Sequence, residues 1–353
     1  MKNTKDGELS ELFGASTLSA DRKVRQYRMR ARARLALSQL PADQQEMLAA
    51  YTHGVNQGLN AFKVVPFVYL LTRTEPTHWQ GEDSLLVALS MFLTLNESSI
   101  MRELALSAMH AALPEAAYQF LTAKGGKWDA PLDDSSFEWP PIPSAHELDL
   151  RTTQSEKPSN NNQLNNDLPG SNSFAVGGTL TGGPSLVAND MHLTLRVPNI
   201  WFRTRLIYPK QTATDTVNIQ HDITGISLPG LPMMIIGSNR HIAWSFTNSY
   251  GDYADWVRVT IDPNDPMRYR DTNGWQPMHT YEEVIHVRDA PDETLSIRET
   301  KWGPIIALDH DQTPLALAWT ALQPDGLNLG LVDIEKIRTA GEAARIAQHA
   351  GMP

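Results

Sequence analysis

Cysteine is absent from this chain of 353 residues. Its absence excludes disulfides, thiol catalysis, iron–sulfur clusters and cysteine-ligated zinc. The chain also lacks a long apolar run near its start, because the charged residues of MKNTKDGELSELFG are followed by polar ones. These residues therefore contain neither a signal peptide nor a membrane anchor, and we expect no membrane span further along.

The chain also has fewer basic than acidic residues, 30 Lys and Arg against 40 Asp and Glu, which gives a formal net charge of -10. A nucleic-acid partner or an anionic membrane requires a positive footprint, so both are disfavoured. One basic stretch remains, and its residues alternate with Ala and Leu: Arg22, Lys23, Arg25, Arg28, Arg30, Arg32 and Arg34. This pattern favours a helix with a solvated or salt-bridged face.

Two hydrolase motifs are missing. No G-x-S-x-G occurs, and GISLP at residues 225–229 lacks both the closing glycine and the strand-to-helix context. An unrelated serine hydrolase with a Ser-His-Asp triad is therefore a weak alternative. His310 stands between Asp309 and Asp311 without a second histidine at helical spacing, which argues against a metal hydrolase.

The chain divides into a helical part and a strand-rich part. Apolar residues recur at helical spacing in two stripes: Met47, Leu48, Tyr51, Val55, Leu59 and Phe62; and Leu85, Leu86, Leu89, Phe92 and Leu93. Residues 151–170, RTTQSEKPSNNNQLNNDLPG, are polar and indicate an exposed linker. We predict helices over 1–143, a linker or spacer over 144–170 and sheets over 171–353, an α+β architecture. The strands expected are SFAV, SLVA, WFRTRLIY, MMIIG, HIAWSF, DWVRVTI, TLSIRE and LALAWTAL.

The junction of Gly170 and Ser171 is a candidate site of self-cleavage, because a polar linker ends there and a strand begins. Gly170 offers an unhindered carbonyl to the Ser171 hydroxyl, so an N-to-O acyl shift followed by hydrolysis would free the Ser171 amine. A terminal amine has a pKa of about 7.7 to 8.0, which suits a general base acting on its own hydroxyl. Ser171 would then be both nucleophile and base.

A hairpin count adds His192 to this site. If SFAV and SLVA pair around Thr181 and Gly182, His192 lies opposite Ser171. The competing interpretations are a turn serine at the junction and a half-buried histidine bonded to backbone.

Several motifs together resemble the penicillin acylase family of N-terminal-nucleophile (Ntn) hydrolases. GELSELFG (7–14), residues 40–62 and residues 76–91 are similar to its α-subunit, and GSNSFAVGG (170–178) and NDMHL (189–193) to the start of its β-subunit. Residues 227–256 and LALAWTAL (315–322) resemble further signatures. The resemblance implies a four-layer αββα sandwich, here incomplete, preceded by a helical α-subunit region.

Carried over by position, the resemblance implies a role for each site residue. Ser171 matches the catalytic serine, His192 a histidine that orients it, and Asn248 the residue whose backbone N–H points into the oxyanion hole. A calcium site is implied at Asp252, Ala254 and Asp255, with Glu103 as the helical ligand and Glu97 as its competitor. No organic cofactor is implied.

The chain also departs from the family pattern. The segment with the second oxyanion donor, an asparagine side chain, should begin just after residues 347–353, and the early N-terminal stretch with the export signal is absent. We therefore expect a fragment truncated at both ends, with exposed sheet edges and weak or no turnover. A truncated, non-catalytic remnant is the main alternative.

The remaining implications concern substrate, partner and location. The family's substrates are N-acylated amines such as β-lactams and N-acyl-homoserine lactones, and the bond that is cut is a linear amide. The implied roles are therefore antibiotic metabolism and quorum quenching. The partner of the α segment is the β segment of the same chain, and relatives are usually exported to the periplasm. Met233, Met234, Ile235 and Phe246 either line an apolar pocket or belong to the core.

Overall fold

The protein is described by a computed structural model. Its described residues are 6–126, 128–129, 131, 133, 135–149, 151, 170–193, 195, 197, 199–209, 220–249 and 251–351. Most of the predicted linker, residues 152–169, lies outside the described residues.

Helices form the first part of the chain: α2 (Leu9–Phe13), η1 (Gly14–Thr17), α3 (Leu18–Arg25), α4 (Met29–Gln39), α5 (Ala42–Asn60), α6 (Phe67–Thr72), α7 (Gly81–Ala112) and α8 (Glu115–Leu121). Pro41 is the N-cap of α5, and Gln80 and Asp83 form a capping box at the start of α7.

The second part is built from antiparallel strands: β1 (Gly170–Val176), β2 (Leu186–His192), β3 (Phe202–Pro209), β4 (Gln220–Ser227), β5 (Ile236–Ser238), β6 (Ala243–Trp244), β7 (Ala254–Arg258), β8 (Ile261–Asp262), β9 (Asp265–Asp271), β10 (Gly274–Pro277), β11 (His279–Ile285), β12 (Glu293–Glu299), β13 (Ile305–Leu308) and β14 (Pro314–Trp319). Four helical segments interrupt or follow them: α9 (Gly178–Thr181), η2 (Thr320–Leu322), η3 (Gly330–Lys336) and α10 (Ala340–Ala347). Helices followed by antiparallel sheets confirm the α+β class.

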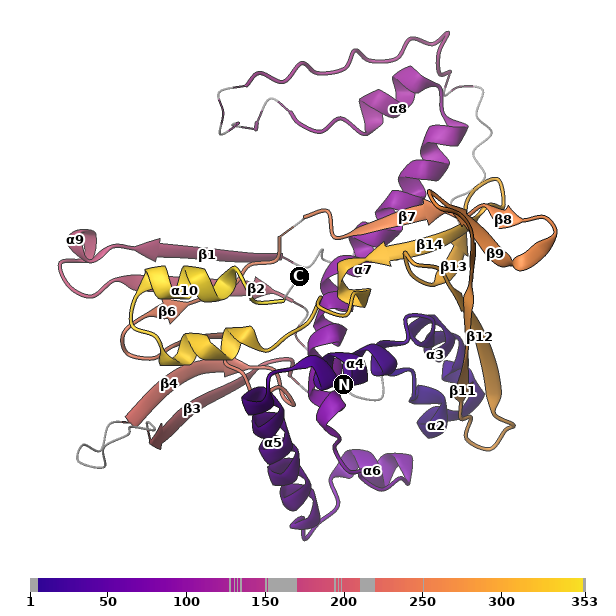
Figure 1. Ribbon diagram of the computed structural model, residues 1–353. Coiled ribbons are helices and arrows are strands. Elements are labelled where there is room, and N and C mark those ends of the chain that lie inside the picture. Colours follow the sequence, from indigo (N-terminus) through magenta and orange to yellow (C-terminus); the bar gives the residue numbers. More distant parts are fainter. Residues whose placement is uncertain are drawn as a thin grey trace.

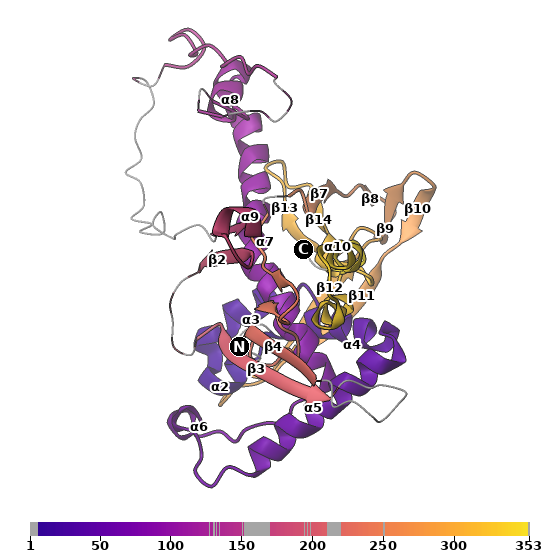
Figure 2. The same cartoon turned by 90° about the vertical axis from the view of Figure 1, so that its left-hand side faces the viewer.

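The strands form five small sheets, ordered β1-β2, β3-β4-β5-β6, β13-β14-β7, β10-β9-β8 and β11-β12. The β1–β2 hairpin extends away from the centre with α9 at its tip (Figure 1). In this view α7 runs between that hairpin and the β7–β14 pair, and Figure 2 shows α8 at the far end of α7.

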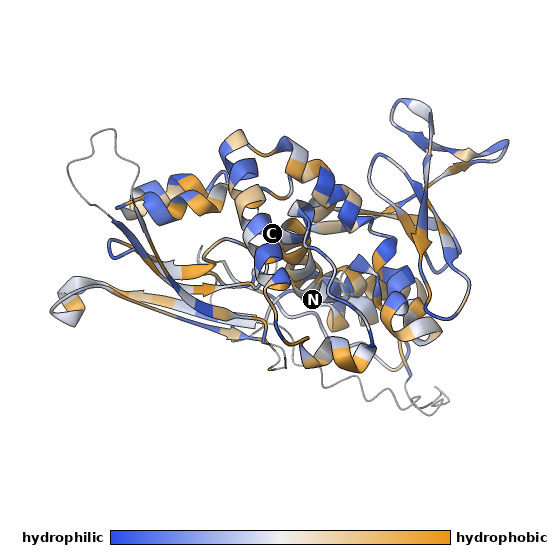
Figure 3. Cartoon of the chain, turned by 90° about the horizontal axis from the view of Figure 1, so that it is seen from below, coloured by the Kyte–Doolittle hydropathy of each residue, from blue (hydrophilic) through white to orange (hydrophobic). Residues whose placement is uncertain are grey.

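One hydrophobic core joins the two parts of the chain. Its buried residues come from α7 (Leu85, Leu89, Phe92), from the strands and turns (Ile223, Met234, Leu317, Trp319) and from the C-terminal segment (Leu329, Leu331, Ile334). Figure 3 shows hydrophobic residues in the middle of the fold, and hydrophobic and hydrophilic residues mixed on the outer helices. The predicted stripe of α7 is buried, whereas Leu48 is the buried member of the α5 stripe.

Among the described residues, α7 alone is long and apolar enough to cross a membrane, and 61% of that window is buried inside the protein. A core helix of a water-soluble protein passes the same test, because it too is apolar on most faces. In this structure α7 packs against α4, α5 and β7.

The basic stretch forms the salt-bridged face that the sequence pattern favours. Arg28, which precedes α4, and Arg32 of α4 donate to Glu299 of β12 at 2.9 and 2.8 Å. Arg25 of α3 donates to Glu283 of β11 at 3.1 Å. These ion pairs attach α3 and α4 to the β11–β12 hairpin. Several arginines of the basic stretch are thus used in contacts within the fold.

Candidate active site

Ser171 occupies the second position of β1, directly after Gly170, with which the strand begins. The β1–β2 register fixes its backbone opposite Met191. Its hydroxyl donates to the carbonyl oxygen of Gly170 at 2.6 Å. The candidate nucleophile therefore lies against the carbonyl of the peptide bond that precedes it.

The predicted opposition of Ser171 and His192 is wrong by one residue. Gly170 pairs with His192, and Ser171 pairs with Met191. The cause is the connection between the strands: it contains the helical turn α9 and Gly182 at φ 67°, and the pairing is centred on Thr181 alone rather than between Thr181 and Gly182. A slip of one residue moves a side chain to the other face of a sheet.

His192 therefore has a different partner. Its Nε2 lies 3.1 Å from Oδ2 of Asp190, and the neighbouring Oδ1 of Asp190 accepts from the backbone N–H of Asn172 at 3.2 Å. The bond to His192 is the main cause that lowers the pKa of Asp190. Through Asp190, His192 is therefore linked to the backbone of Asn172. Among the described contacts, His192 has none with the Ser171 hydroxyl.

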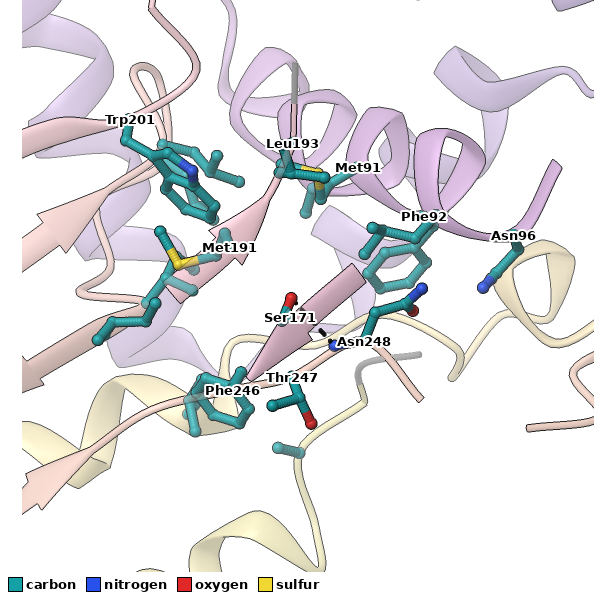
Figure 4. A pocket seen from close by; sticks show the side chains of 18 of the residues that line it. Met91, Phe92, Asn96, Ser171, Met191, Leu193, Trp201, Phe246, Thr247 and Asn248 are labelled. Atoms are coloured by element: carbon teal, nitrogen blue, oxygen red, sulfur yellow. Dashed lines mark hydrogen bonds between the residues drawn. The ribbon is translucent and has the colours of Figure 1, made fainter. Parts of the chain in front are cut away.

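Asn248 lies in the irregular segment that follows β6, and its backbone N–H is directed at Ser171 (Figure 4). Its nitrogen is 3.5 Å from the Ser171 Oγ. The Asn248 side-chain Nδ2 is buried and has no hydrogen-bond partner among the described residues. An N–H this close to the nucleophile is suited to an oxyanion that forms beside it.

The Ser171 hydroxyl opens into an apolar cavity of about 250 Å³. Its walls come from α7, β2, the turn before β5 and the C-terminal segment: Ala88, Met91, Phe92, Leu95, Asn96, Met191, Leu193, Trp201, Leu228, Leu231, Ile235, Ile236, Phe246, Thr247, Leu331, Ala347 and Ala350, with Ser171 and Asn248 at one side (Figure 4). Such a cavity can hold an acyl chain.

Of the four residues considered for an apolar pocket, Ile235 and Phe246 line this cavity, whereas Met233 and Met234 are buried in the core. Sequence reasoning missed Met91 and Trp201 as walls. The sequence held a signal for Met91, because the first half of α7 is apolar on most of its faces and has apolar side chains left over for a cavity after packing.

A second group of residues lies between α7 and the start of β7. Carboxylate oxygens of Glu103, Asp252 and Asp255 lie within 4.8 Å of one another. Burial raises the pKa of Glu103, and the charges of Asp255 and Asp252 raise it further. A second cavity, separate from the one at Ser171, lies beside Glu103 and Asp252, and Ala254 and Lys124 also line it. Three crowded carboxylates are a donor set that fits a hard divalent cation.

Glu97, the competing ligand, is placed elsewhere. It is ion-paired with Lys23 of α3, two turns of α7 before Glu103. The geometry therefore favours Glu103 over Glu97 as the third carboxylate of this group.

Comparison with known proteins gives the following matches. The family model described as penicillin amidase matches residues 1–353. An acyl-homoserine lactone acylase QuiP of Pseudomonas fluorescens (strain Pf0-1) is 26% identical over 324 residues, covering 85% of this chain and 36% of the relative. The penicillin acylase 2 proenzyme of Pseudomonas sp. (strain SE83) is 28% identical over 315 residues, covering 86% of this chain and 38% of the relative. The chain thus spans little more than a third of the length of these relatives.

Among solved structures, the thermostable penicillin G acylase from Alcaligenes faecalis matches at 23% identity with a TM-score of 0.35, over 44% of this chain and 26% of that chain.

Proposed function

This chain belongs to the penicillin amidase family, and from that premise we propose that it is an amide hydrolase that removes an acyl group from an amine. The supporting observation is the placement of the Ser171 hydroxyl. It lies 2.6 Å from the Gly170 carbonyl oxygen and 3.5 Å from the Asn248 nitrogen, beside an apolar cavity. One serine thus faces a peptide carbonyl, an N–H donor and space for an acyl chain.

The first step we propose is cleavage between Gly170 and Ser171. The Ser171 Oγ attacks the Gly170 carbonyl carbon, an ester forms, and the C–N bond breaks as the nitrogen takes up the hydroxyl proton. Water then hydrolyses the ester, which leaves a Gly170 carboxylate and a free Ser171 amine and hydroxyl. The α part and the β part would remain associated, because the core contains residues of both.

Substrate hydrolysis follows the same pattern. The Ser171 amine takes the proton of its own hydroxyl, Oγ attacks the acyl carbonyl, and the oxyanion accepts from the Asn248 N–H. The amine product leaves with a proton, and water releases the acid from the acyl-enzyme. We propose that His192 acts only indirectly, through Asp190 and the backbone of Asn172.

The substrates that we propose are N-acyl-homoserine lactones and acylated β-lactams. The cavity beside Ser171 is lined mainly by apolar side chains, which suits an aliphatic or aromatic acyl group. Relatives of this chain are named acyl-homoserine lactone acylases and penicillin acylase 2. We also propose an αββα sandwich and a periplasmic location, on the basis of the family alone.

We also propose that Glu103, Asp252, Asp255 and the Ala254 carbonyl hold a calcium ion. The site joins α7 to the strand that follows the oxyanion segment, so the cation would stabilise the scaffold and take no part in the reaction.

The proposed activity is tested by release of free amine from N-acyl-homoserine lactones of increasing chain length. Purified protein is compared with its Ser171→Ala variant, and amine is quantified by a fluorogenic label. We expect weak turnover by the parent protein and none by the variant. A chain that is folded and cleaved, yet releases no amine from any lactone or acylated β-lactam, would support the non-catalytic alternative.

A further inference from the structure

The side chain of Asn189 joins the two segments that form the candidate active site. Asn189 lies in β2, and its Nδ2 donates to the carbonyl of Asn172 at 2.6 Å and to the carbonyl of Phe246 at 3.0 Å. Asn172 directly follows Ser171, and Phe246 lies two residues before Asn248. One amide group thus spans the nucleophile strand and the oxyanion segment.

These acceptors determine how the amide is oriented. Both are carbonyl oxygens, so only the NH₂ end of Asn189 can face them, and both of its hydrogens are used. The Oδ1 must then point away, and it is buried without a partner among the described residues. An unpaired buried acceptor costs about 1–3 kcal/mol, so the arrangement has a stability penalty.

A further side-chain contact between these segments, besides that of the Asn248 N–H with Ser171, restricts their separation less. Ser173 Oγ and Ser245 Oγ lie 2.5 Å apart, and this contact between exposed side chains is one rotatable hydroxyl against another. The Asn189 amide is planar, and its two bonds diverge, one to β1 and one to the irregular segment after β6. It therefore restricts the distance between Ser171 and Asn248, whereas a single hydroxyl contact leaves rotation free.

We propose that Asn189 is a positioning residue for the proposed amide hydrolysis: it keeps the Asn248 N–H within reach of the Ser171 Oγ. The predicted effect of Asn189 on the reaction rate rests on the proposed function. Its predicted effect on the position of the Asn248 segment rests on the hydrogen bonds alone. Asn189 contacts the main chain on both sides of the site. A displacement of about 1 Å between reacting groups can cost on the order of 10²-fold in rate.

The test compares Asn189→Asp, Asn189→Ala and Asn56→Asp. Asp is isosteric and removes both donors, while Ala removes the link without adding charge. Asn56 is a matched control: it is half-buried, as Asn189 is, and its amide also joins two segments, with Nδ2 donating to the Trp79 carbonyl at 2.9 Å and Oδ1 accepting from the Trp79 N–H at 2.7 Å. Both of its bonds lie away from the Ser171 cavity.

Two readouts separate positioning from stability. The first is kcat and KM on one N-acyl-homoserine lactone: both Asn189 variants should lose about 10²-fold in kcat with KM within about threefold, because the lost interaction acts in the transition state. The second is hydrogen exchange of residues 245–249, which should be about tenfold faster in both Asn189 variants. Asn56→Asp should change neither, although it lowers the melting temperature.

Each outcome decides between the two interpretations. If exchange at residues 245–249 is unchanged in the Asn189 variants, or if Asn56→Asp lowers kcat equally, Asn189 has no positioning role. If the parent protein shows no turnover, the proposed function fails, and the exchange experiment still decides whether Asn189 holds the segment.

Discussion

At the scale of single residues, the account depends on which atoms surround the Ser171 hydroxyl. The Gly170 carbonyl and the Asn248 N–H are there, as the sequence positions implied, and Met191 is the cross-strand neighbour. His192 is not beside it, because the odd-length connection through Thr181 changes the register by one residue. Counting outward from an assumed turn could not detect this, because the α9 sequence, GTLT, contains no recognisable helix signal.

The contact of His192 with Asp190 leads to a prediction. His192→Gln should slow self-cleavage and turnover by about tenfold at most, far less than Ser171→Ala, because the imidazole reaches the site only through Asp190 and the backbone of Asn172. Pulse-chase gels of the precursor measure the cleavage rate. A loss as complete as that of Ser171→Ala would mean that His192 acts directly on the nucleophile.

A second prediction concerns calcium. Millimolar Ca²⁺ should raise the melting temperature of the parent protein, because an ion that binds only the folded state stabilises it. Glu103→Gln should abolish this response, whereas Glu97→Gln, a change on the same helix at a residue paired with Lys23, should keep it. An equal response in both variants would exclude Glu103 as a ligand.

The pKa of Glu103 gives this response a pH dependence. Burial and the two aspartates raise that pKa, so Glu103 holds its proton to a higher pH than an ordinary glutamate. A proton and Ca²⁺ compete for the carboxylate. The stabilisation by Ca²⁺ should therefore be full at high pH and shrink as the pH falls through the raised pKa, which differential scanning calorimetry at several pH values can measure.

At the scale of secondary-structure elements, the helices were more predictable than the sheets. The helical spacing of the apolar residues was sufficient to locate α5 and α7. The strands β1, β3, β12 and β14 matched expected runs, but β4, β9, β10, β11 and β13 were not among those runs. Charged residues and His interrupt β9 and β11, and β10 is the four-residue stretch GWQP, so local β propensity is weak in these three strands. Pairing supplied by neighbouring strands, and not local propensity, makes them strands.

The attachment of α4 to β12 gives a third prediction. Glu299 is largely buried and accepts from both Arg28 and Arg32, and Arg28 also lies over the Tyr281 ring at 3.2 Å. Glu299→Gln should lower the free energy of unfolding by about 2–3 kcal/mol, because two arginines lose their charged partner. Glu293→Gln, which breaks an exposed pair with Arg22, should have a smaller effect. Urea denaturation compares them, and equal effects would refute the argument.

At the scale of the whole molecule, both parts of the chain share one core, while several apolar side chains remain exposed. Phe174 and Leu186 of the β1–β2 hairpin are 62% and 59% exposed, and Leu71 of α6 is 77% exposed. Exposed edges and apolar faces of this kind were expected from the resemblance, and they favour association. The hairpin that holds Ser171 is thus among the less covered elements, whereas α7, which forms the cavity wall, is well packed.

The central claim, that Ser171 is a self-generated N-terminal nucleophile, is tested most directly by intact mass and N-terminal sequencing of the purified protein. The Ser171→Ala variant is compared, with Ser185→Ala, an exposed serine between β1 and β2, as the matched control. We predict two fragments in the parent protein and in Ser185→Ala, one beginning Ser-Asn-Ser-Phe, and a single uncleaved chain in Ser171→Ala. An uncleaved chain of 39.3 kDa in all three proteins, or cleavage that survives Ser171→Ala, would contradict the account.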